Sequence, residues 1–211
     1  MHQKNIIAAG KDLKDASKVL IMIHGRGGSA EDIISLGGHL QVDDFALLAP
    51  QATGNTWYPY SFLAPTTQNE PWLSSALNLL KEMVADLESK GFQRDQIYFL
   101  GFSQGACLTL EFVTRHAAKY GGVVAFTGGL IGDKINLDNY KGDFLNTPVF
   151  MGTSNPDPHI PVERFYATSN ILKDMNAAVT EKVYEGMGHT INQDEIDKAN
   201  SVVFSAPTLN A

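Results

Sequence analysis

The chain has 211 residues, of which 44% are hydrophobic and 18% are charged, and its formal net charge is −7. This length and composition predict a single globular domain over residues 1–211, long enough to bury a sizeable core. The acidic balance, without a cluster of lysine and arginine, argues against nucleic acid and anionic membranes as partners.

The N-terminus and the cysteine content indicate a cytoplasmic protein. The first ten residues lack the apolar core of a signal peptide. No run approaches the ~18 apolar residues of a membrane span, so we expect no stable membrane insertion. Cys107 is the single cysteine, which excludes an intrachain disulfide and makes oxidising export unnecessary for folding.

The chain begins with segments typical of strands. Residues 5–9 and 18–24 are two such segments joined by a polar turn, and residues 19–23 of the second are continuously apolar, as in a central strand covered on both faces. Ser29, or the acidic pair after it, can cap a helix to about residue 40. Another strand is expected at 45–49, before Pro50.

Residues 51–71 form a long segment rich in aromatic residues, glycine and proline, without a clear period. A segment of this length inside a compact domain is usually functional or a lid. Apolar residues at helical spacing then predict an amphipathic helix over 72–90, ended by Gly91.

The second half of the chain continues the alternation of strands and helices. This order predicts an α/β fold with a mostly parallel central sheet and helices on both faces. In such sheets, reacting groups collect at the carboxyl ends of the strands. The expected elements are strands at 97–100, 122–126, 148–152 and 181–185, and helices at 106–119, 162–178 and 191–203.

The segment from Gly101 to Gly105 has the pattern Gly-x-Ser-x-Gly between a predicted strand and a predicted helix. A strand that turns abruptly into a helix brings the backbones close together, and glycine removes the Cβ atoms that would collide there. The bare pattern also occurs by chance as a simple Gly/Ser turn. Its position between strand and helix favours a nucleophile elbow that exposes Ser103 above a helix N-terminus.

Ser103, Asp157 and His189 each follow a different predicted strand, so all three are expected at one edge of the sheet. A serine hydroxyl needs a base to take its proton, and a carboxylate on the other ring nitrogen of that base fixes its tautomer. Their order along the chain is that of the α/β-hydrolase triad.

Other residues compete for these roles. Among six histidines, His24 more plausibly braces the glycine-rich loop, and His159 is too close in sequence to Asp157 to be the expected base. For the acid, the open alternatives to Asp157 are Asp133, Asp138 and Asp143. Cys107 is read as a small packing residue. No metal is expected, because no His, Asp or Glu group shows ligand spacing.

Five motifs in order along most of the chain resemble the phospholipase/carboxylesterase family of α/β-hydrolases, which includes acyl-protein thioesterases. They are His24-Gly25-Arg26-Gly27-Gly28, Ala49-Pro50-Gln51, Gly101-Phe102-Ser103-Gln104-Gly105, Asp157-Pro158-His159-Ile160-Pro161 and Gly186-Met187-Gly188-His189. The resemblance implies a Ser103–His189–Asp157 triad and an oxyanion hole made by the backbone N–H groups of Arg26 and Gln104. It also implies esters or thioesters as substrates, no cofactor and no large cap domain.

The leading hypothesis is therefore a serine hydrolase that cleaves small-molecule carboxylic esters or thioesters through an acyl-enzyme on Ser103, as a monomer or homodimer. The alternatives are a lysophospholipase or acyl-protein thioesterase acting on lipid-like acyl chains, and a non-catalytic binding module. Because binding pockets are mostly apolar, residues close to these loops and in the aromatic segment are expected to contact the substrate. The candidates are Gly25, Trp57, Tyr58, Leu130, Pro158 and Met187.

Overall fold

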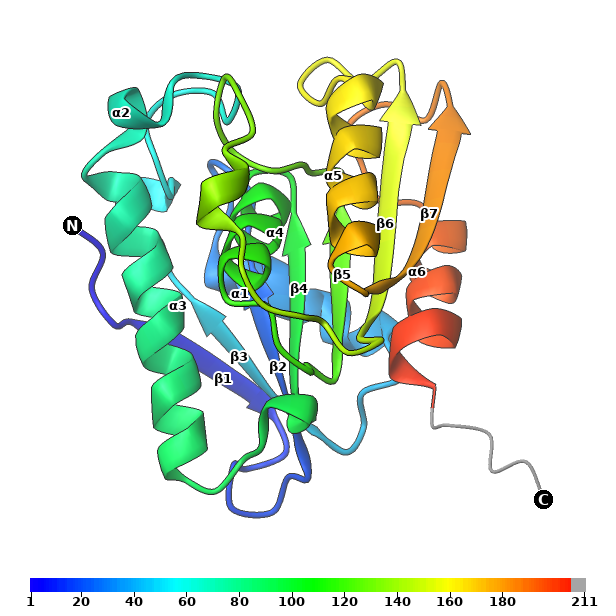
Figure 1. Cartoon of the computed structure of the whole chain (residues 1–211). Coiled ribbons are helices and arrows are strands. Elements are labelled where there is room, and N and C mark those ends of the chain that lie inside the picture. The colour runs from blue at the N-terminus through cyan, green and yellow to red at the C-terminus, as the bar shows by residue number, and fades with distance from the viewer. Residues whose placement is uncertain (206–211) are drawn as a thin grey trace.

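The structure is a computed structural model that describes residues 1–205. Its centre is a seven-stranded sheet in the order β1-β3-β2-β4-β5-β6-β7 (Figure 1). The first strand pairs antiparallel with β3, and every other neighbouring pair is parallel. The strands are β1 (Ile6–Gly10), β2 (Lys18–Ile23), β3 (Phe45–Pro50), β4 (Ile97–Phe102), β5 (Gly122–Phe126), β6 (Pro148–Asn155) and β7 (Ala178–Glu185).

Helices cover both faces of this sheet (Figure 1). One face carries α3 (Trp72–Ser89), α4 (Gln104–Arg115) and α5 (Val162–Asp174), and the other carries α1 (Ala30–Ile34) and α6 (Gln193–Ala199). The shorter helical segments are α2 (Thr66–Asn69), η1 (Ser35–His39), η2 (Thr53–Asn55), η3 (Arg94–Gln96), η4 (Leu137–Asn139) and η5 (Asn200–Phe204). This confirms the predicted α/β class with a mostly parallel sheet.

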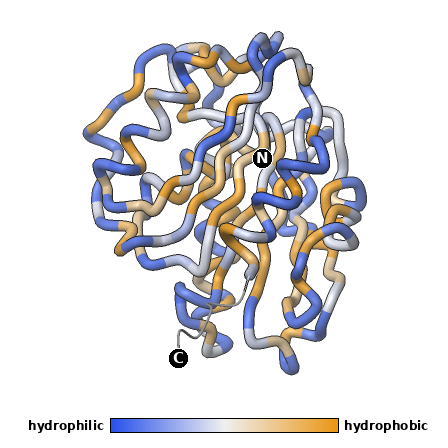
Figure 2. Tube along the Cα trace, turned by 90° about the vertical axis from the view of Figure 1, so that its right-hand side faces the viewer, coloured by the Kyte–Doolittle hydropathy of each residue, from blue (hydrophilic) through white to orange (hydrophobic). Residues whose placement is uncertain are grey.

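Alternation along the strands divides the core into two layers. On β2, Ile21 and Ile23 belong to the layer beneath α3 and α4, whereas Leu20 and Met22 belong to the layer beneath α1 and α6. All four side chains are fully buried, which explains why this strand is apolar without interruption. In Figure 2 the trace is mostly hydrophobic along the strands at the centre of the molecule and more hydrophilic around them.

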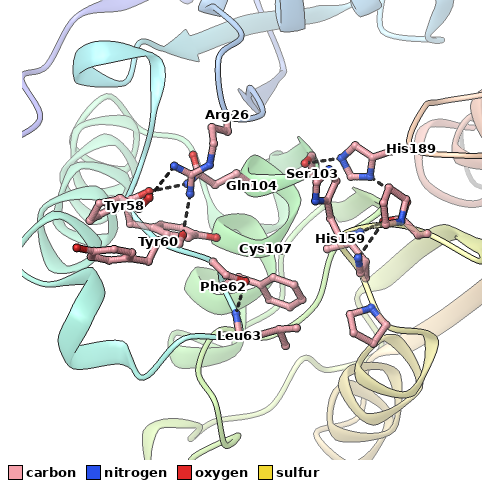
Figure 3. Close-up of a pocket in the computed structure, with 16 residues that line it drawn as sticks. Arg26, Tyr58, Tyr60, Phe62, Leu63, Ser103, Gln104, Cys107, His159 and His189 are labelled. Carbon is pink, nitrogen blue, oxygen red and sulfur yellow. Dashed lines mark hydrogen bonds and ion pairs between the residues drawn. The ribbon is translucent and has the colours of Figure 1, made fainter.

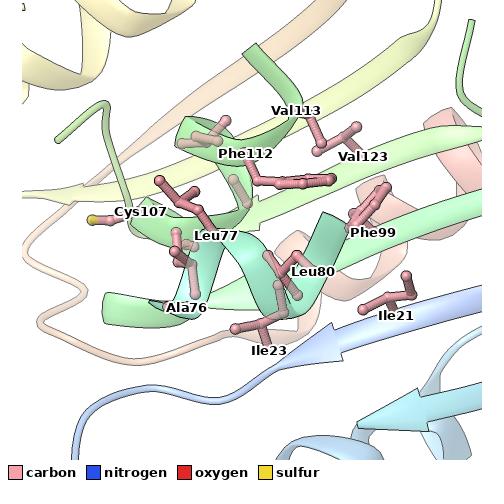
Figure 4. Packing of buried hydrophobic residues seen from close by; sticks show 14 of the residues in the cluster. Ile21, Ile23, Ala76, Leu77, Leu80, Phe99, Cys107, Phe112, Val113 and Val123 are labelled. Atoms are coloured by element: carbon pink, nitrogen blue, oxygen red, sulfur yellow. The ribbon is translucent and has the colours of Figure 1, made fainter. Parts of the chain in front are cut away.

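The layer beneath α4 contains closely packed aromatic and aliphatic side chains. Phe112 of α4 lies against Phe99 of β4 with ring centroids 5.5 Å apart, and Val113 and Val123 lie beside them (Figure 4). Burying such side chains contributes roughly 1.5–3 kcal/mol each. This packing holds α4, and with it the turn at its N-terminus, in a fixed position on the sheet.

Several predicted boundaries differ from the structure. The helix expected at 29–40 is α-helical only to Ile34 and continues as the 3₁₀ segment η1, in which Gly37 and Gly38 weaken the α-helix. The helix expected at 162–178 ends at Asp174, and the left-handed Asn176, with φ 62°, turns the chain into β7. The domain predicted over 1–211 includes residues 206–211, which lie outside the described residues.

Candidate active site

Ser103 lies in the turn between β4 and α4, with φ 54° and ψ −120°. A non-glycine residue in such a conformation stores backbone strain of order 1–3 kcal/mol, which persists only where the surroundings enforce it. The two flanking glycines explain how the turn forms. A Cβ on Gly105 would lie 2.1 Å from the carbonyl oxygen of Ile23, and one on Gly101 would lie 2.4 Å from the carbonyl oxygen of Gly105. No side chain fits at either position.

The structure brings the three predicted catalytic side chains together, and Figure 3 shows Ser103 and His189 turned toward each other. His189 Nε2 lies 2.7 Å from Ser103 Oγ, and His189 Nδ1 lies 2.9 Å from Asp157 Oδ2. An ionised carboxylate can only accept hydrogen bonds, so Nδ1 carries the proton donated to Asp157. Nε2 is then free to accept the hydroxyl proton of Ser103, which is the geometry required of a general base.

The carboxyl group of Asp157 is fully buried and accepts three hydrogen bonds. Its Oδ1 accepts from the backbone N–H groups of His159 and Ile160, both at 2.8 Å. Burial alone would raise the pKa of Asp157, but the hydrogen bonds from the His159 backbone, the His189 ring and the Ile160 backbone together hold that pKa below its ordinary value. Asp157 therefore stays ionised and fixes the orientation of the imidazole.

His189 lies in the loop after β7. Gly186 and Gly188 in this loop have positive φ angles of 64° and 80°, which the loop needs to turn back over the sheet edge. The N–H of Gly188 donates to Ser154 Oγ at 2.9 Å, which ties this loop to the end of β6. The His189 ring is flanked by Phe102, with centroids 5.3 Å apart, and by His159, with centroids 4.7 Å apart.

The glycine-rich loop after β2 lies directly beside the nucleophile. A Cβ on Gly25 would lie 3.3 Å from Ser103 Cβ. His24, as expected, braces this loop: its Nδ1 bonds the carbonyl of Gly25 at 2.7 Å, and its Nε2 accepts from the N–H of Ala52 at 3.1 Å. Within residues 1–205, neither the N–H of Arg26 nor that of Gln104 donates to a protein acceptor, so both are available to a ligand.

The side chains of Arg26 and Gln104 have a structural role. The carboxamide of Gln104 accepts from the N–H of Trp57 at 2.9 Å and donates to the carbonyl of Tyr58 at 2.8 Å. The guanidinium of Arg26 donates to the carbonyls of Pro59 and Tyr60. The aromatic segment is thereby fixed to both loops that surround Ser103.

A cavity of about 750 Å³ opens over Ser103 and is lined by the three clustered side chains. Its walls come from the aromatic segment 58–63, the start of α4 and the acid loop 157–161, with Cys107 among the lining residues. We call it the main cavity. Of the predicted substrate contacts, Tyr58 and Pro158 line it, whereas Gly25 lines a smaller neighbouring cavity.

The other three predicted contacts are Trp57, Leu130 and Met187. Contrary to the prediction, none of them lines the main cavity. Trp57 is fully buried behind the wall and donates its Nε1–H to the carbonyl of His24. Leu130 is fully buried in the core. The sulfur of Met187 accepts from Asn192 Nδ2 within its own loop.

Sequence reasoning did not assign a substrate contact to Phe62 and Leu63, which line the main cavity, or to Phe102 and Ile191, which line the smaller one. The available signal was that Phe102 lies within the motif around Ser103 and that Ile191 follows the motif ending at His189 by two residues. Among the alternative acids, Asp143 accepts hydrogen bonds from the Asn176 side chain and from the backbone N–H of Leu145. It precedes β6 and therefore lies at the edge of the sheet opposite Ser103, which follows the carboxyl end of β4.

Neither a metal cluster nor a membrane helix is found within residues 1–205. No group of three or more His, Cys, Asp or Glu side chains there is arranged to hold a metal ion. No helix in the same range is long and apolar enough to cross a bilayer.

Comparison with known proteins identifies relatives across nearly the whole chain. The family model described as Phospholipase/Carboxylesterase matches residues 2–204. Acyl-protein thioesterase 1 of Saccharomyces cerevisiae is 26% identical over 94% of this chain and 97% of its own length. A probable carboxylesterase SOBER1-like of Arabidopsis thaliana is 25% identical over 88% of this chain and 78% of its own.

Solved structures agree with this relationship. The crystal structure of a phospholipase/carboxylesterase from Dyadobacter fermentans superposes with a TM-score of 0.95 at 57% identity, covering 97% of this chain and 98% of that one. The fold is shared with the crystal structure of esterase PE8, at a TM-score of 0.78 and 24% identity over 92% of this chain and 95% of that one.

Proposed function

The chain belongs to the phospholipase/carboxylesterase family, and from this premise we propose that it is a serine hydrolase that cleaves carboxylic esters and thioesters through an acyl-enzyme on Ser103. One observation carries the proposal: Ser103, His189 and Asp157 are joined by hydrogen bonds of 2.7 and 2.9 Å at a cavity of about 750 Å³. Relatives named as acyl-protein thioesterase and carboxylesterase support the reaction class.

The proposed reaction has two halves. Ser103 Oγ attacks the carbonyl carbon while His189 Nε2 takes the hydroxyl proton, and Asp157 stabilises the imidazolium that forms. The negative charge on the carbonyl oxygen is stabilised by the backbone N–H groups of Arg26 and Gln104. The carbonyl–oxygen or carbonyl–sulfur bond breaks as His189 returns the proton to the leaving atom. Water, deprotonated by His189, then attacks the acyl-enzyme and releases the acid and Ser103.

The partner that fits this site is a small-molecule ester. All groups of the proposed site come from one chain, so a monomer or a homodimer can carry the activity. A lipid-like acyl chain is a second candidate, supported by Phe62 and Leu63 on the wall of the main cavity and by the thioesterase relatives. A non-catalytic binding module is disfavoured, because it would have no use for the strained φ of 54° at Ser103.

Hydrolysis of p-nitrophenyl esters of increasing acyl length tests this function. We expect turnover by the wild type and by Ser201→Ala, which changes an exposed serine far from the site in sequence and in the fold. Ser103→Ala should lose about 10³-fold or more of kcat while remaining folded by circular dichroism. Retained turnover in Ser103→Ala, or an inactive folded wild type, would refute the proposal.

A further inference from the structure

A second cavity, of about 260 Å³, lies on the other side of the glycine-rich loop from the aromatic segment. We call it the second cavity. It is bounded by the loop 24–28, by Ile33 of α1 and Leu36 of η1, and by Phe102 and Ile191. The proposed reaction places no part of the substrate in this cavity.

The second cavity is adjacent to the reacting centre, whose Ser103 and His189 line the main cavity. Arg26, whose backbone N–H is one of the proposed oxyanion donors, lines both cavities. Gly25, on the wall of the second cavity, is close enough to Ser103 that an added Cβ would lie 3.3 Å from the serine Cβ. An ester carbonyl placed at Ser103 Oγ in the main cavity would therefore lie next to Gly25 and Arg26, which form a wall of the second cavity.

The polar side chains around the second cavity are already engaged in hydrogen bonds. Both ring nitrogens of His24 are hydrogen-bonded, and burial lowers the pKa of this histidine, so its ring is neutral. The carboxylate of Asp32 accepts from the N–H of Ser29 at 2.8 Å. The guanidinium of Arg26 is engaged with the aromatic segment. The surface left for a ligand is formed by apolar side chains: Ile33, Leu36, Phe102 and Ile191.

The position of His189 indicates which half of the substrate enters. The group on the leaving atom must lie beside the imidazole, because His189 hands its proton to that atom. His189 itself lines the main cavity, but two walls of the second cavity adjoin it: the Phe102 ring lies 5.3 Å from the His189 ring between centroids, and Ile191 is two residues beyond His189 in the chain. The main cavity, almost three times larger, has the volume for the acyl half.

We propose that the second cavity is the leaving-group subsite and that it takes a compact apolar alcohol or thiol portion. This inference rests on the proposed function. A buried apolar cavity of about 150 Å³ accommodates benzene. A volume of about 260 Å³ open on one side therefore accepts a benzyl group or a short alkyl chain. Esters of polar alcohols would bury less of this apolar surface on binding, so we expect them to be poorer substrates.

Two matched ester series test the proposal by release of acid. In the alcohol series, acetate is constant and the alcohol is methyl, propyl or benzyl. In the acyl series, methanol is constant and the acid is acetic, butyric or phenylacetic. The enzymes are the wild type, Leu36→Trp, which fills the second cavity, Leu36→Ala, which enlarges it, and Leu137→Trp, a control at an exposed leucine.

We expect Leu36→Trp to lower the benzyl-to-methyl ratio of kcat/KM in the alcohol series by about tenfold or more, and Leu36→Ala to shift selectivity toward bulkier alcohols. The acyl series should keep its wild-type ratios in both variants, and Leu137→Trp should keep all ratios. A changed acyl series with an unchanged alcohol series would overturn the assignment to the leaving group. Unchanged ratios in both series would overturn the subsite while leaving the proposed function intact, because that function is tested separately by ester hydrolysis in the wild type and its loss in Ser103→Ala.

Discussion

The guanidinium of Arg26 donates a hydrogen bond of 2.7 Å to the backbone carbonyl of Tyr60. It also bonds Thr56 Oγ1 at 3.0 Å and the carbonyl of Pro59 at 2.9 Å. One side chain thus joins the loop of the proposed oxyanion hole to the wall of the main cavity. The backbone of Arg26 is proposed to act on the reacting oxygen, while its side chain holds the wall that receives the substrate.

Arg26→Met separates these two roles, since it keeps the backbone N–H and removes the three side-chain hydrogen bonds. Charged hydrogen bonds contribute about 1.5–3 kcal/mol each when buried, and less at an exposed residue such as Arg26. We expect kcat/KM to fall by about tenfold, mainly through KM for esters with large acyl groups. Arg26→Lys, which retains a cation, should lose less. Kinetics of Arg26→Met indistinguishable from those of the wild type would contradict this role.

Gly105→Ala tests the close approach that forms the elbow. The new Cβ would lie 2.1 Å from the carbonyl oxygen of Ile23, and backbone atoms cannot move aside as a flexible side chain can. We expect a loss of about 2 kcal/mol or more in the free energy of unfolding, and reduced ester hydrolysis from displaced Ser103.

The matched control for this substitution is Gly38→Ala. No heavy atom lies within 4 Å of a Cβ added at Gly38, and its φ is not positive. Its free energy of unfolding should stay within about 0.5 kcal/mol of the wild type. Urea denaturation of both variants measures the difference, and equal stabilities would show that the elbow tolerates a side chain.

Glu195 makes the stability of the protein depend on pH. Its side chain is fully buried at the start of α6, where one carboxyl oxygen accepts from the N–H of Asn192 and the other has no partner within residues 1–205. Burial raises the pKa of Glu195 from 4.5 to about 7. Between these values the folded protein binds more protons than the unfolded chain, so the free energy of unfolding falls as pH rises from 4.5 to about 7.

Glu195→Gln should remove this dependence, because glutamine keeps an acceptor for the Asn192 N–H but does not ionise. The wild type should lose about 3 kcal/mol more than the variant between pH 4.5 and pH 8, as measured by urea denaturation. Parallel pH curves for the two proteins would show that Glu195 does not titrate in this range.

The elbow could be predicted from the sequence because its requirements are local. Gly101 and Gly105 have no room for a side chain, so the pattern around Ser103 follows from the sharp turn itself. The fold class could be predicted for a similar reason, since the alternation of apolar strands and amphipathic helices determines which faces are buried. The acid was less sharply predicted, because Asp157 and three other aspartates all follow strands; Asp157 was preferred for its flanking prolines, its place after a core strand and the resemblance to a known family.

The substrate contacts could not be predicted from position in the chain. Trp57 and Tyr58 are neighbours in sequence, but Tyr58 lines the main cavity whereas Trp57 is buried behind it, where its Nε1–H donates to the carbonyl of His24. The second cavity escaped sequence analysis because Leu36 and Ile191 are brought together only by packing of the loops on either side of Ser103.

Mapping the residue modified by a fluorophosphonate probe tests the proposed nucleophile most directly. We predict that one probe adds to the folded protein and that peptide mass spectrometry places it on Ser103. Labelling should be strongly slowed in His189→Ala, because the hydroxyl loses the base that lies 2.7 Å away. A probe attached to another residue, or a folded wild-type protein that takes up no probe, would contradict an acyl-enzyme on Ser103.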